Sequence, residues 1–290
     1  MNAALADAIA EMLAVEVLEC RPTVGGDICT AYRLTLGDGR RIFAKTRHDA
    51  PEGMFRSEAE GLAWLARAGA ARVPAPVAVC DGDAALRFLA LEWIEPGRPN
   101  RAYDTQLGRD LAALHSAGSD RFGFASDGFI GSIPQDNTPG EDWAEFYWTR
   151  RLEPLLRETC DTGLLDEAAR RGFSRLADRL PELVGPDEAP ARLHGDLWSG
   201  NAICDSAGSP WLIDPAAYGG HREMDLAMMR LFGGFGSECF AAYHEAHPLA
   251  DGHEDRVALY QLYPLLVHVL LFGSGYVGRT REALRSYVSA

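Results

Sequence analysis

The side chains best suited to chemistry lie close together, within residues 193–215. Asp196 and Asn201 are five positions apart on a loop interrupted by glycine, and Asp214 follows thirteen positions later, after a short apolar run typical of a strand. Phosphoryl transfer from a magnesium nucleotide needs a carboxylate that takes a hydroxyl proton and oxygen ligands that hold the metal. The spacing therefore predicts Asp196 as the general base and Asn201 and Asp214 as magnesium ligands.

A histidine two positions before Asp196 makes this prediction more specific. Asp and Asn are common in turns and helix caps, so an isolated pair at this spacing carries little information. With His194, the stretch matches the spacing of the kinase catalytic loop, H-x-D-x-x-x-x-N, and Asp214 stands where a metal-binding Asp follows that loop. The pattern therefore favours a kinase site over an ordinary turn.

The basic residues indicate another functional position. The chain has 28 Lys and Arg residues, and Lys45 is the only lysine among them. A genomic preference for arginine codons explains the scarcity of lysine, but it does not explain why this position kept one. A compact ammonium group differs from a planar guanidinium where the charge must bridge phosphate oxygens in a confined site. Lys45 is therefore predicted to bind the nucleotide phosphates.

A helix predicted over residues 55–68 places a carboxylate near that lysine. Apolar residues recur there at helical spacing, and Glu58 lies near the apolar face, from which it can reach the ammonium group of Lys45. A solvated helix glutamate is the alternative interpretation. Glu60 competes for the same role, but it is rotated by about 200° from Glu58 around the helix axis.

The N-terminal segment predicts an antiparallel sheet of five strands, because short apolar runs alternate there with glycine-rich turns. The third of these strands ends at Lys45. The first two predicted strands lie within residues 23–36, and the other three occupy residues 41–45, 73–79 and 86–94.

Two loops of this segment are predicted to contact a nucleotide. Backbone amides at Gly25 and Gly26 could approach phosphates, although Gly-Gly-Asp is also typical of an ordinary turn. A Glu-Pro-Gly sequence after the last strand breaks the chain and predicts a hinge between lobes. Backbone groups just before this hinge are expected to face the adenine; they belong to Glu92, Trp93 and Ile94.

Beyond the hinge the pattern becomes helical. Asp225 opens a predicted helix, and its carboxylate is expected to support the catalytic loop by accepting backbone N–H groups. His115 is expected to be a buried or capping histidine rather than a ligand. Residues 257–288 predict two amphipathic helices without chemistry of their own. The aromatic-rich residues 122–152 are either a wall of the substrate site or a well-packed excursion.

Composition and charge limit the classes of protein. With 290 residues, 47% hydrophobic and 24% charged, the chain is typical of a globular protein with one large domain or two lobes. A formal charge of -14 argues against a nucleic-acid partner, because phosphate contacts need basic clusters. No membrane partner is expected either, because the longest apolar run, residues 262–272, is too short to span a bilayer.

Cysteine usage and the N-terminus favour a cytoplasmic location. The six cysteines are scattered without a C-x-x-C pair, so neither a zinc site nor a disulfide framework is predicted. Reduced thiols fit the cytosol. Residues 1–18 lack a basic n-region, so they predict an amphipathic helix rather than a signal peptide.

With these motifs in place, the chain resembles the fructosamine kinase (ketosamine-3-kinase) family, a branch of the protein-kinase-like fold that includes aminoglycoside phosphotransferases and choline kinases. The resemblance runs through nearly the whole chain, and a Trp after Asp-Leu in the catalytic loop separates this family from those relatives. The matching stretches are HGDLWSGN (194–201), IDPA (213–216), GHREMDLA (220–227), FGGF (232–235), FGF (122–124) and IPQDN (133–137).

This resemblance implies ATP-dependent phosphorylation of the sugar 3-hydroxyl of a ketosamine, an amine glycated through its nitrogen. The product is unstable and releases the amine, so the family is regarded as deglycating. The base, metal ligands and ATP-binding pair that the family implies are the residues reached above from spacing alone. The resemblance adds Trp198, expected to stack against the sugar or its amine substituent, and His194 as a further substrate residue.

Two features depart from the family pattern. Some members carry a cysteine within the glycine-rich loop that can form an intermolecular disulfide, whereas here the thiol is shifted to Cys29, so redox-switched dimerisation is not expected. The metal loop reads Asp-Pro-Ala rather than Asp-Phe-Gly, and no long activation segment precedes the next helix. Regulation by loop phosphorylation is therefore not expected, and a small-molecule acceptor is favoured over a folded protein.

The combined prediction is an α+β, bilobal, protein-kinase-like fold. Residues 1–94 form an N-lobe with a five-stranded antiparallel sheet and helices, and residues 95–290 form a mainly α-helical C-lobe. ATP and Mg²⁺ are the predicted cofactors, a small-molecule or protein-attached ketosamine is the predicted partner, and the chain is expected to be a monomer or weak homodimer.

Two alternatives stay open at this stage. The first is a phosphotransferase acting on an aminoglycoside, choline or another amino alcohol, because an acidic cleft suits any cationic amine. The second is a nucleotide-binding pseudokinase, a class that usually lacks the base, the metal ligands or the lysine.

Overall fold

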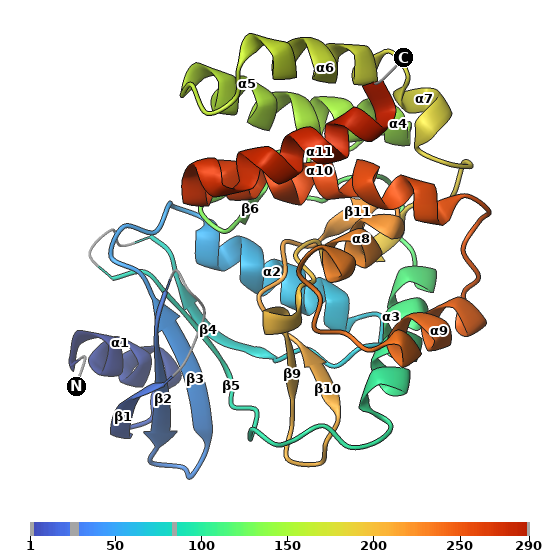
Figure 1. The fold of residues 1–290 in the computed structure, drawn as a ribbon. Helices are drawn as coiled ribbons and strands as arrows, with labels where there is room; N and C mark the ends of the chain where they lie inside the picture. Colours follow the sequence, from blue (N-terminus) through green and yellow to red (C-terminus); the bar gives the residue numbers. More distant parts are fainter. Residues whose placement is uncertain (1–2, 24–28, 83–85, 289–290) are drawn as a thin grey trace.

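The N-terminal part of the molecule is built on a five-stranded antiparallel sheet (Figure 1). The computed structural model describes residues 3–23, 29–82 and 86–288. The strands lie in the order β1-β2-β3-β5-β4, which confirms the predicted sheet. Their bounds are Val17–Thr23 (β1), Thr30–Leu36 (β2), Arg41–Thr46 (β3), Pro76–Cys80 (β4) and Phe88–Glu92 (β5).

Alternation along the central strand β3 decides which side chains face which helix. Ile42 and Ala44 belong to the buried cluster that contains Leu5 and Ile9 of α1 (Ala3–Leu13), so they face α1. Because successive side chains of a strand point to opposite faces, Lys45 projects from the other face. That face is covered by α2 (Met54–Ala66), which lies between the sheet and the helical part of the molecule in Figure 1.

The N-terminal helix is shorter than the sequence pattern indicates. The prediction extended it through residue 18, but α1 ends at Leu13 and Val17 already begins β1. Ala14 has a left-handed backbone with φ 51°, which ends the helix. The prediction was wrong because pairing of β1 with β2 overrides the helical periodicity of Val17 and Leu18.

The C-terminal part is mainly helical and carries three two-stranded sheets, so the predicted α+β class is confirmed. Its strands pair as β6 with β7, β8 with β11, and β9 with β10. The strands are β6 (Gly128–Ile130), β7 (Ile133–Gln135), β8 (Ala191–Leu193), β9 (Ala202–Cys204), β10 (Pro210–Leu212) and β11 (Tyr218–Gly220). The helices are α3 (Tyr103–Ser116), α4 (Trp143–Phe146), α5 (Glu153–Asp161), α6 (Glu167–Ala177), α7 (Leu180–Leu183), α8 (Glu223–Phe232), α9 (Ser237–Ala246), α10 (His253–Phe272) and α11 (Val277–Val288).

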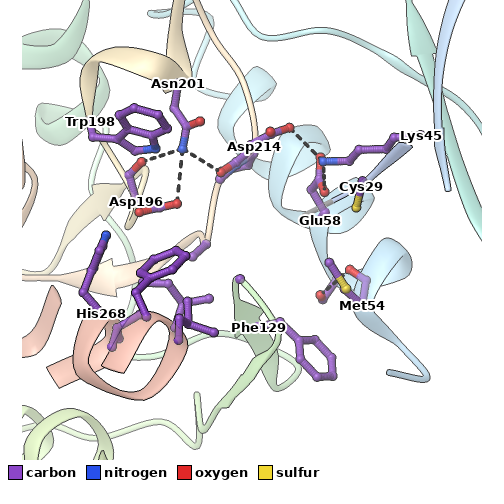
Figure 2. Close-up of a pocket in the computed structure, with 18 of the residues that line it drawn as sticks. Cys29, Lys45, Met54, Glu58, Phe129, Asp196, Trp198, Asn201, Asp214 and His268 are labelled. Atoms are coloured by element: carbon purple, nitrogen blue, oxygen red, sulfur yellow. Dashed lines mark hydrogen bonds and ion pairs between the residues drawn. The ribbon is translucent and has the colours of Figure 1, made fainter. Parts of the chain in front are cut away.

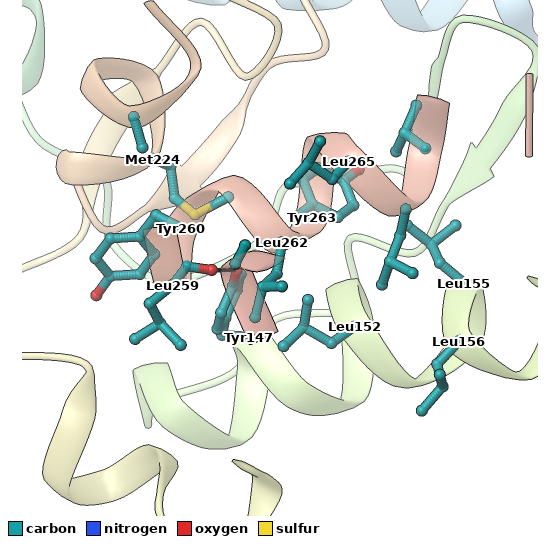
Figure 3. Close-up of a cluster of buried hydrophobic side chains, with 14 of the residues drawn as sticks. Tyr147, Leu152, Leu155, Leu156, Met224, Leu259, Tyr260, Leu262, Tyr263 and Leu265 are labelled. Carbon is teal, nitrogen blue, oxygen red and sulfur yellow. Dashed lines mark hydrogen bonds between the residues drawn. The ribbon is translucent and has the colours of Figure 1, made fainter. Parts of the chain in front are cut away.

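Helix α10 runs through the centre of the C-terminal core. It packs against the continuous helical segment formed by α4, a π-helical turn over residues 147–152 and α5 (Figure 3). The Tyr147 hydroxyl donates a hydrogen bond to the Leu259 carbonyl at 2.7 Å, so a phenol in this core keeps a polar partner. The aromatic stretch over residues 122–152 thus packs largely into the core, with Trp143 only 6% exposed.

Helix α10 also belongs to a stretch with the length and apolar character of a membrane span. Within the described residues, one helical stretch, residues 253–288, is long and apolar enough to cross a bilayer, with a mean hydropathy of 1.5 in its most apolar window. Half of that window, 50%, is buried inside the protein. A buried core helix of a globular protein has these properties as well, so the stretch is weak evidence for a span.

Apolar packing continues across the predicted hinge. One buried cluster contains Leu62 of α2 and Leu89 of β5 together with Leu111 of α3 and Met229 of α8. After the hinge sequence, the Gly97 backbone N–H donates to the Cys204 carbonyl at 3.0 Å. The sheet and the helical part therefore meet through a shared core, and the division at residue 94 stays a prediction.

Candidate active site

A buried carboxylate holds the loop that follows β8. Asp225, in the first turn of α8, accepts the backbone N–H of His194 through Oδ2 and that of Gly195 through Oδ1, each at 2.8 Å. His115 Nε2 lies 3.1 Å from the same Oδ2, while its Nδ1 contacts the Tyr243 hydroxyl. Burial opposes ionisation of Asp225, but these hydrogen bonds and the two histidines outweigh it and lower its pKa. The geometry matches the support predicted for Asp225 and the buried position predicted for His115.

The backbone after His194 needs a glycine. Gly195 has φ +83°, and a Cβ at this position would overlap the main-chain carbonyl of Ala216. The Ala216 N–H donates to the His194 carbonyl at 3.0 Å, so the catalytic loop and the loop after β10 are joined at this point. Only a residue without a side chain allows the two loops to approach so closely.

His194 corrects one prediction, because its side chain faces the protein interior. The residue is fully buried, its Nε2 donates to the Ile213 carbonyl at 2.9 Å, and its Nδ1 accepts the Asp196 N–H at 3.3 Å. Burial lowers its pKa, consistent with this neutral tautomer. His194 therefore ties the loop that carries Asp196 to the loop that carries Asp214, and it does not line the cavity described below.

Asp196, Asn201 and Asp214 come together at the end of these loops. Asn201 Nδ2 donates to the Asp196 carbonyl at 2.8 Å, to Asp196 Oδ2 at 3.2 Å and to the Asp214 carbonyl at 3.4 Å. Since the amide nitrogen takes these contacts, Asn201 Oδ1 is left as an acceptor. An amide oxygen and a carboxylate are the oxygen ligands that Mg²⁺ prefers, so the side chains of Asn201 and Asp214 fit the metal.

Asp214 has an unusual backbone as well as a suitable side chain. Its φ of 54° lies in the left-handed region, which costs a non-glycine residue of order 1–3 kcal/mol. The surrounding hydrogen bonds hold this conformation, since the neighbouring Ile213 N–H donates to the Asn201 carbonyl at 3.0 Å. Such strain is concentrated at functional sites, and here it turns the carboxylate toward Lys45.

Lys45 sits between two carboxylates. Its Nζ lies 2.6 Å from Glu58 Oε2 and 2.8 Å from Asp214 Oδ1, and the Lys45 and Glu58 side chains are only 8% and 10% exposed (Figure 2). Burial disfavours the ammonium, but the carboxylates of Asp214 and Glu58 outweigh it and raise the pKa of Lys45. The group therefore carries its charge at the point predicted for phosphate binding.

The environment of Asp196 suits a proton acceptor. Burial raises the pKa of its carboxyl to about 7, with a further contribution from the Asp214 charge and an opposing one from the Asn201 amide. A base with a pKa near the operating pH combines a useful ionised fraction with affinity for the proton it receives.

These groups share one cavity of about 370 Å³. Lys45, Glu58 and Asp214 lie together toward one end, and Asp196 lies toward the other end with Trp198 and His268, as Figure 2 shows. Phe129 of β6 forms a further part of the lining. The cavity therefore has a polar end at Lys45, Glu58 and Asp214 and an aromatic end that includes Trp198 and His268.

Comparison with known proteins agrees with this chemistry. The family model described as fructosamine kinase matches residues 1–290. The chain belongs to the fructosamine kinase family.

Three curated relatives of this fructosamine kinase illustrate the range of the family. A probable ketoamine kinase of Enterococcus faecium is 36% identical over 92% of this chain and 94% of its own. A protein-ribulosamine 3-kinase of Oryza sativa is 36% identical over 92% of this chain and 78% of its own. The ketosamine-3-kinase of Mus musculus is 34% identical over 86% of this chain and 88% of its own.

Two solved structures have folds similar to that of this chain. A crystal structure from Thermobifida fusca, described as a candidate fructosamine-3-kinase, superimposes with a TM-score of 0.90 at 41% identity, covering 99% of both chains. An aminoglycoside phosphotransferase bound to ADP and hygromycin B superimposes with a TM-score of 0.63 at 15% identity, covering 99% of this chain and 100% of its own. The second match shows the kinase-like fold alone. As a family member, the protein is a phosphotransferase that acts on a hydroxyl group and uses ATP.

The structure does not link the other residues predicted to bind the nucleotide to the cavity. Gly25 and Gly26 lie outside the described residues. Glu92 ends β5 and is followed by Trp93 and Ile94, and none of the three lines the cavity. Their contact with adenine stays a prediction.

Trp198, predicted to contact the acceptor, and Cys29, the shifted thiol of the glycine-rich loop, both line the cavity. Trp198 packs partly against the C-terminal core and lines the cavity with its remaining surface. Cys29 also lines it, and burial raises the pKa of its thiol against the opposing charge of Lys45. A raised pKa reduces the thiolate population that disulfide chemistry needs.

Part of the cavity wall was missed from the sequence. His268 and Phe272 of α10, with Tyr276 just after it and Phe232 at the end of α8, line the aromatic end. The prediction that the C-terminal helices have no chemistry of their own is therefore corrected for the lining of the site. The available signal was a polar residue, His268, inside an otherwise apolar run.

Proposed function

We propose that the protein transfers the γ-phosphoryl group of Mg-ATP to the 3-hydroxyl of a ketosamine, such as a fructosamine or a ribulosamine. The observation that carries this proposal is the position of Asp196, which shares one cavity with Lys45, Glu58 and Asp214 and lies beside Trp198 and His268 at its aromatic end. An acceptor held against the aromatic wall would present a hydroxyl to Asp196 and, beyond it, to the phosphates.

Asp196 acts as the general base in this reaction. Its carboxylate takes the proton of the 3-hydroxyl as the oxygen forms a bond to the γ-phosphorus and the bond to the β-γ bridging oxygen breaks. The pKa of about 7 lets a substantial fraction of the carboxyl be ionised at neutral pH. The Asn201 amide contacts Asp196 Oδ2 at 3.2 Å and fixes the orientation of the base.

The remaining polar residues position the phosphate chain. The Lys45 ammonium binds phosphate oxygens while Glu58 keeps it in place. Asn201 Oδ1 and the Asp214 carboxylate would hold Mg²⁺, which when bound neutralises the charge of the phosphates. These contacts leave little covalent chemistry to the protein, so positioning and electrostatics provide the rate enhancement.

The relatives named ketosamine-3-kinase and protein-ribulosamine 3-kinase support this acceptor. We further propose that the acceptor is a small-molecule or protein-attached ketosamine, and that the chain acts in the cytoplasm as a monomer or weak homodimer. The base, both metal ligands and the lysine are all present, which argues against a pseudokinase.

The test is ATP consumption by the purified chain with a panel of acceptors: fructosyl-lysine, ribulosyl-lysine, kanamycin and choline. We expect turnover on the two ketosamines only, with phosphate on the sugar 3-oxygen by NMR. Asp196→Asn should reduce kcat roughly 10²–10⁴-fold while ATP binding is retained. Turnover confined to kanamycin or choline would refute the acceptor, and full activity of the Asn variant would refute the base.

A further inference from the structure

One histidine of the cavity wall lies within an aromatic cluster. The His268 ring centroid is 4.7 Å from that of Phe232, 4.9 Å from that of Tyr276 and 5.3 Å from that of Phe272. All four residues line the cavity. Figure 2 shows the His268 side chain on the same side of the cavity as Asp196 and Trp198, opposite the Lys45 end.

A hydrogen bond within α10 fixes the protonation pattern of this ring. His268 Nδ1 lies 2.7 Å from the Pro264 carbonyl, which can only accept, so Nδ1 carries the hydrogen. Burial lowers the pKa of His268. The hydrogen bond to Pro264 opposes this effect and the charge of Arg279 adds to it, so the ring is neutral. Nε2 is then left with a lone pair. Within the described part of the chain, no hydrogen bond to the protein uses it.

The cluster offers two kinds of attraction to one kind of group. An unprotonated imidazole nitrogen accepts a hydrogen bond, and the faces of aromatic rings attract a cation within about 6 Å. A protonated amine has both the N–H donor and the positive charge. A neutral ether or thioether at the same position has neither.

The chemistry of the acceptor brings an amine to this wall. In a ketosamine the reacting hydroxyl is on C3 and the nitrogen is on C1, so only C2 separates the two substituted carbons. With the hydroxyl at Asp196, the nitrogen lies only a few bonds away, and the aromatic end beside Asp196 is the part of the cavity that can receive it. Phe272 is 54% exposed at the outer end of the cluster, where the substituent of the amine can leave toward solvent.

We propose that His268 determines specificity for the acceptor nitrogen: Nε2 accepts a hydrogen bond from the ammonium N–H, within a ring cage of Phe232, Phe272 and Tyr276. The proposal rests on the function proposed above and names the group that the aromatic end recognises. It assigns His268 to binding of the acceptor and gives it no part in nucleotide binding or proton transfer.

Two substitutions separate this role from a structural one. His268→Asn places a carboxamide near the position of Nδ1, so it can keep the contact with Pro264 but cannot reach the position of Nε2. His268→Gln reaches the position of Nε2 with its carboxamide oxygen. A structural histidine would therefore be replaced better by Asn, and a substrate-binding one better by Gln. His244→Asn on α9, outside the cavity, is the control.

The experiment measures kcat and KM for fructosyl-lysine, for its thioether analogue with sulfur in place of the nitrogen, and for ATP. We expect His268→Asn to raise the KM for fructosyl-lysine roughly 10- to 100-fold, the loss expected for a hydrogen bond to a charged group. The KM for the thioether and for ATP should change by less than about threefold, and His268→Gln should recover most of the loss. Thermal melting of all variants checks the fold.

Several results would overturn the proposal. Equal losses for the amine and the thioether, a lowered kcat with unchanged KM, or better activity of the Asn variant than of the Gln variant would each exclude it. If the wild-type enzyme turns over no ketosamine, the proposed function fails separately, and calorimetric binding of the two ligands decides the role of His268. If the Asn variant does not fold, the Gln variant alone tests the proposal. A Gln variant that does not prefer fructosyl-lysine over the thioether would then contradict it.

Discussion

Lys45 Nζ lies 2.6 Å from Glu58 Oε2, across the interface between the central strand β3 and helix α2. The contact joins the sheet to the helix at the polar end of the cavity. The Lys45 ammonium, proposed to bind the nucleotide, is therefore held in place by protein contacts alone.

Glu58→Gln should therefore damage both activity and stability. Removing one partner of a buried pair costs about 3 kcal/mol. The Lys45 ammonium would then be paired with the carboxylate of Asp214, a proposed magnesium ligand, without Glu58 to share it. We expect kcat/KM for ATP to fall roughly 10- to 100-fold, since small displacements at a reacting centre are costly. Glu60→Gln on the same helix, whose carboxylate contacts the Ser126 hydroxyl, is the matched control and should remain near wild type. Equal effects of the two changes would contradict the assignment.

Lys45→Arg tests why the chain keeps its single lysine. The ammonium occupies a position 6% exposed, between two carboxylates, where the planar guanidinium of arginine does not fit without moving one of them. We expect a loss of roughly 100-fold in kcat/KM although the charge is conserved. Arg41→Lys is the control on the same strand. Arg41 forms an exposed ion pair with Glu95, so this exchange should change kcat/KM little. Wild-type kinetics of the Arg variant would show that codon usage alone explains the lysine.

Gly195→Ala tests the close approach of the two loops. Both Gly195 and Gly39 have positive φ, +83° and +86°, but a Cβ at Gly39 would meet no atom within 4 Å. Gly39→Ala should therefore cost only about 1–2 kcal/mol, the price of the left-handed backbone. Gly195→Ala adds an overlap with the Ala216 carbonyl, so we expect several kcal/mol more in denaturant unfolding and loss of turnover. Similar losses in the two variants would rule out the steric argument.

His221 should make the protein less stable in acid. Burial lowers its pKa from 6.5 to about 4, although Glu188 opposes this, and the ring stacks on Tyr260 at 5.2 Å. Between these two pH values the unfolded chain binds a proton that the folded one does not. Stability is therefore fully present above pH 6.5 and falls as the pH drops toward 4, by about 3 kcal/mol from this residue.

The pH dependence of urea unfolding measures this contribution. His221→Asn retains an acceptor for the Glu223 N–H, which His221 Nδ1 accepts at 3.3 Å, but it does not titrate. We expect a shallower decline of the unfolding free energy between pH 6.5 and 4 in this variant, whatever its absolute stability. His48→Asn, at an exposed position, should leave the slope unchanged. An unaltered slope in the His221 variant would exclude it as the source.

Much of the site was determined by local sequence. Asp196, Asn201 and Asp214 stand on two short loops, where glycine and the order of polar residues limit the possible geometries, so spacing was sufficient to predict that they meet. Lys45 and Glu58 could be paired because strand alternation and helical periodicity fix the face on which each side chain projects. Strands β2 to β5 followed from the same periodicities, whereas β1 begins at Val17, inside the stretch predicted as helix.

Tertiary structure alone decided the rest, because burial and long-range contacts are not written into spacing. His194 follows a strand and precedes Asp196, a position that suits a substrate contact as well as an interior one. Only the packing of the two loops turned its side chain inward. His268 reads as part of an apolar helix, and only the position of α10 against the catalytic loop brings its ring to the cavity. Val17 could join a helix or a strand, and pairing with β2 settled the choice.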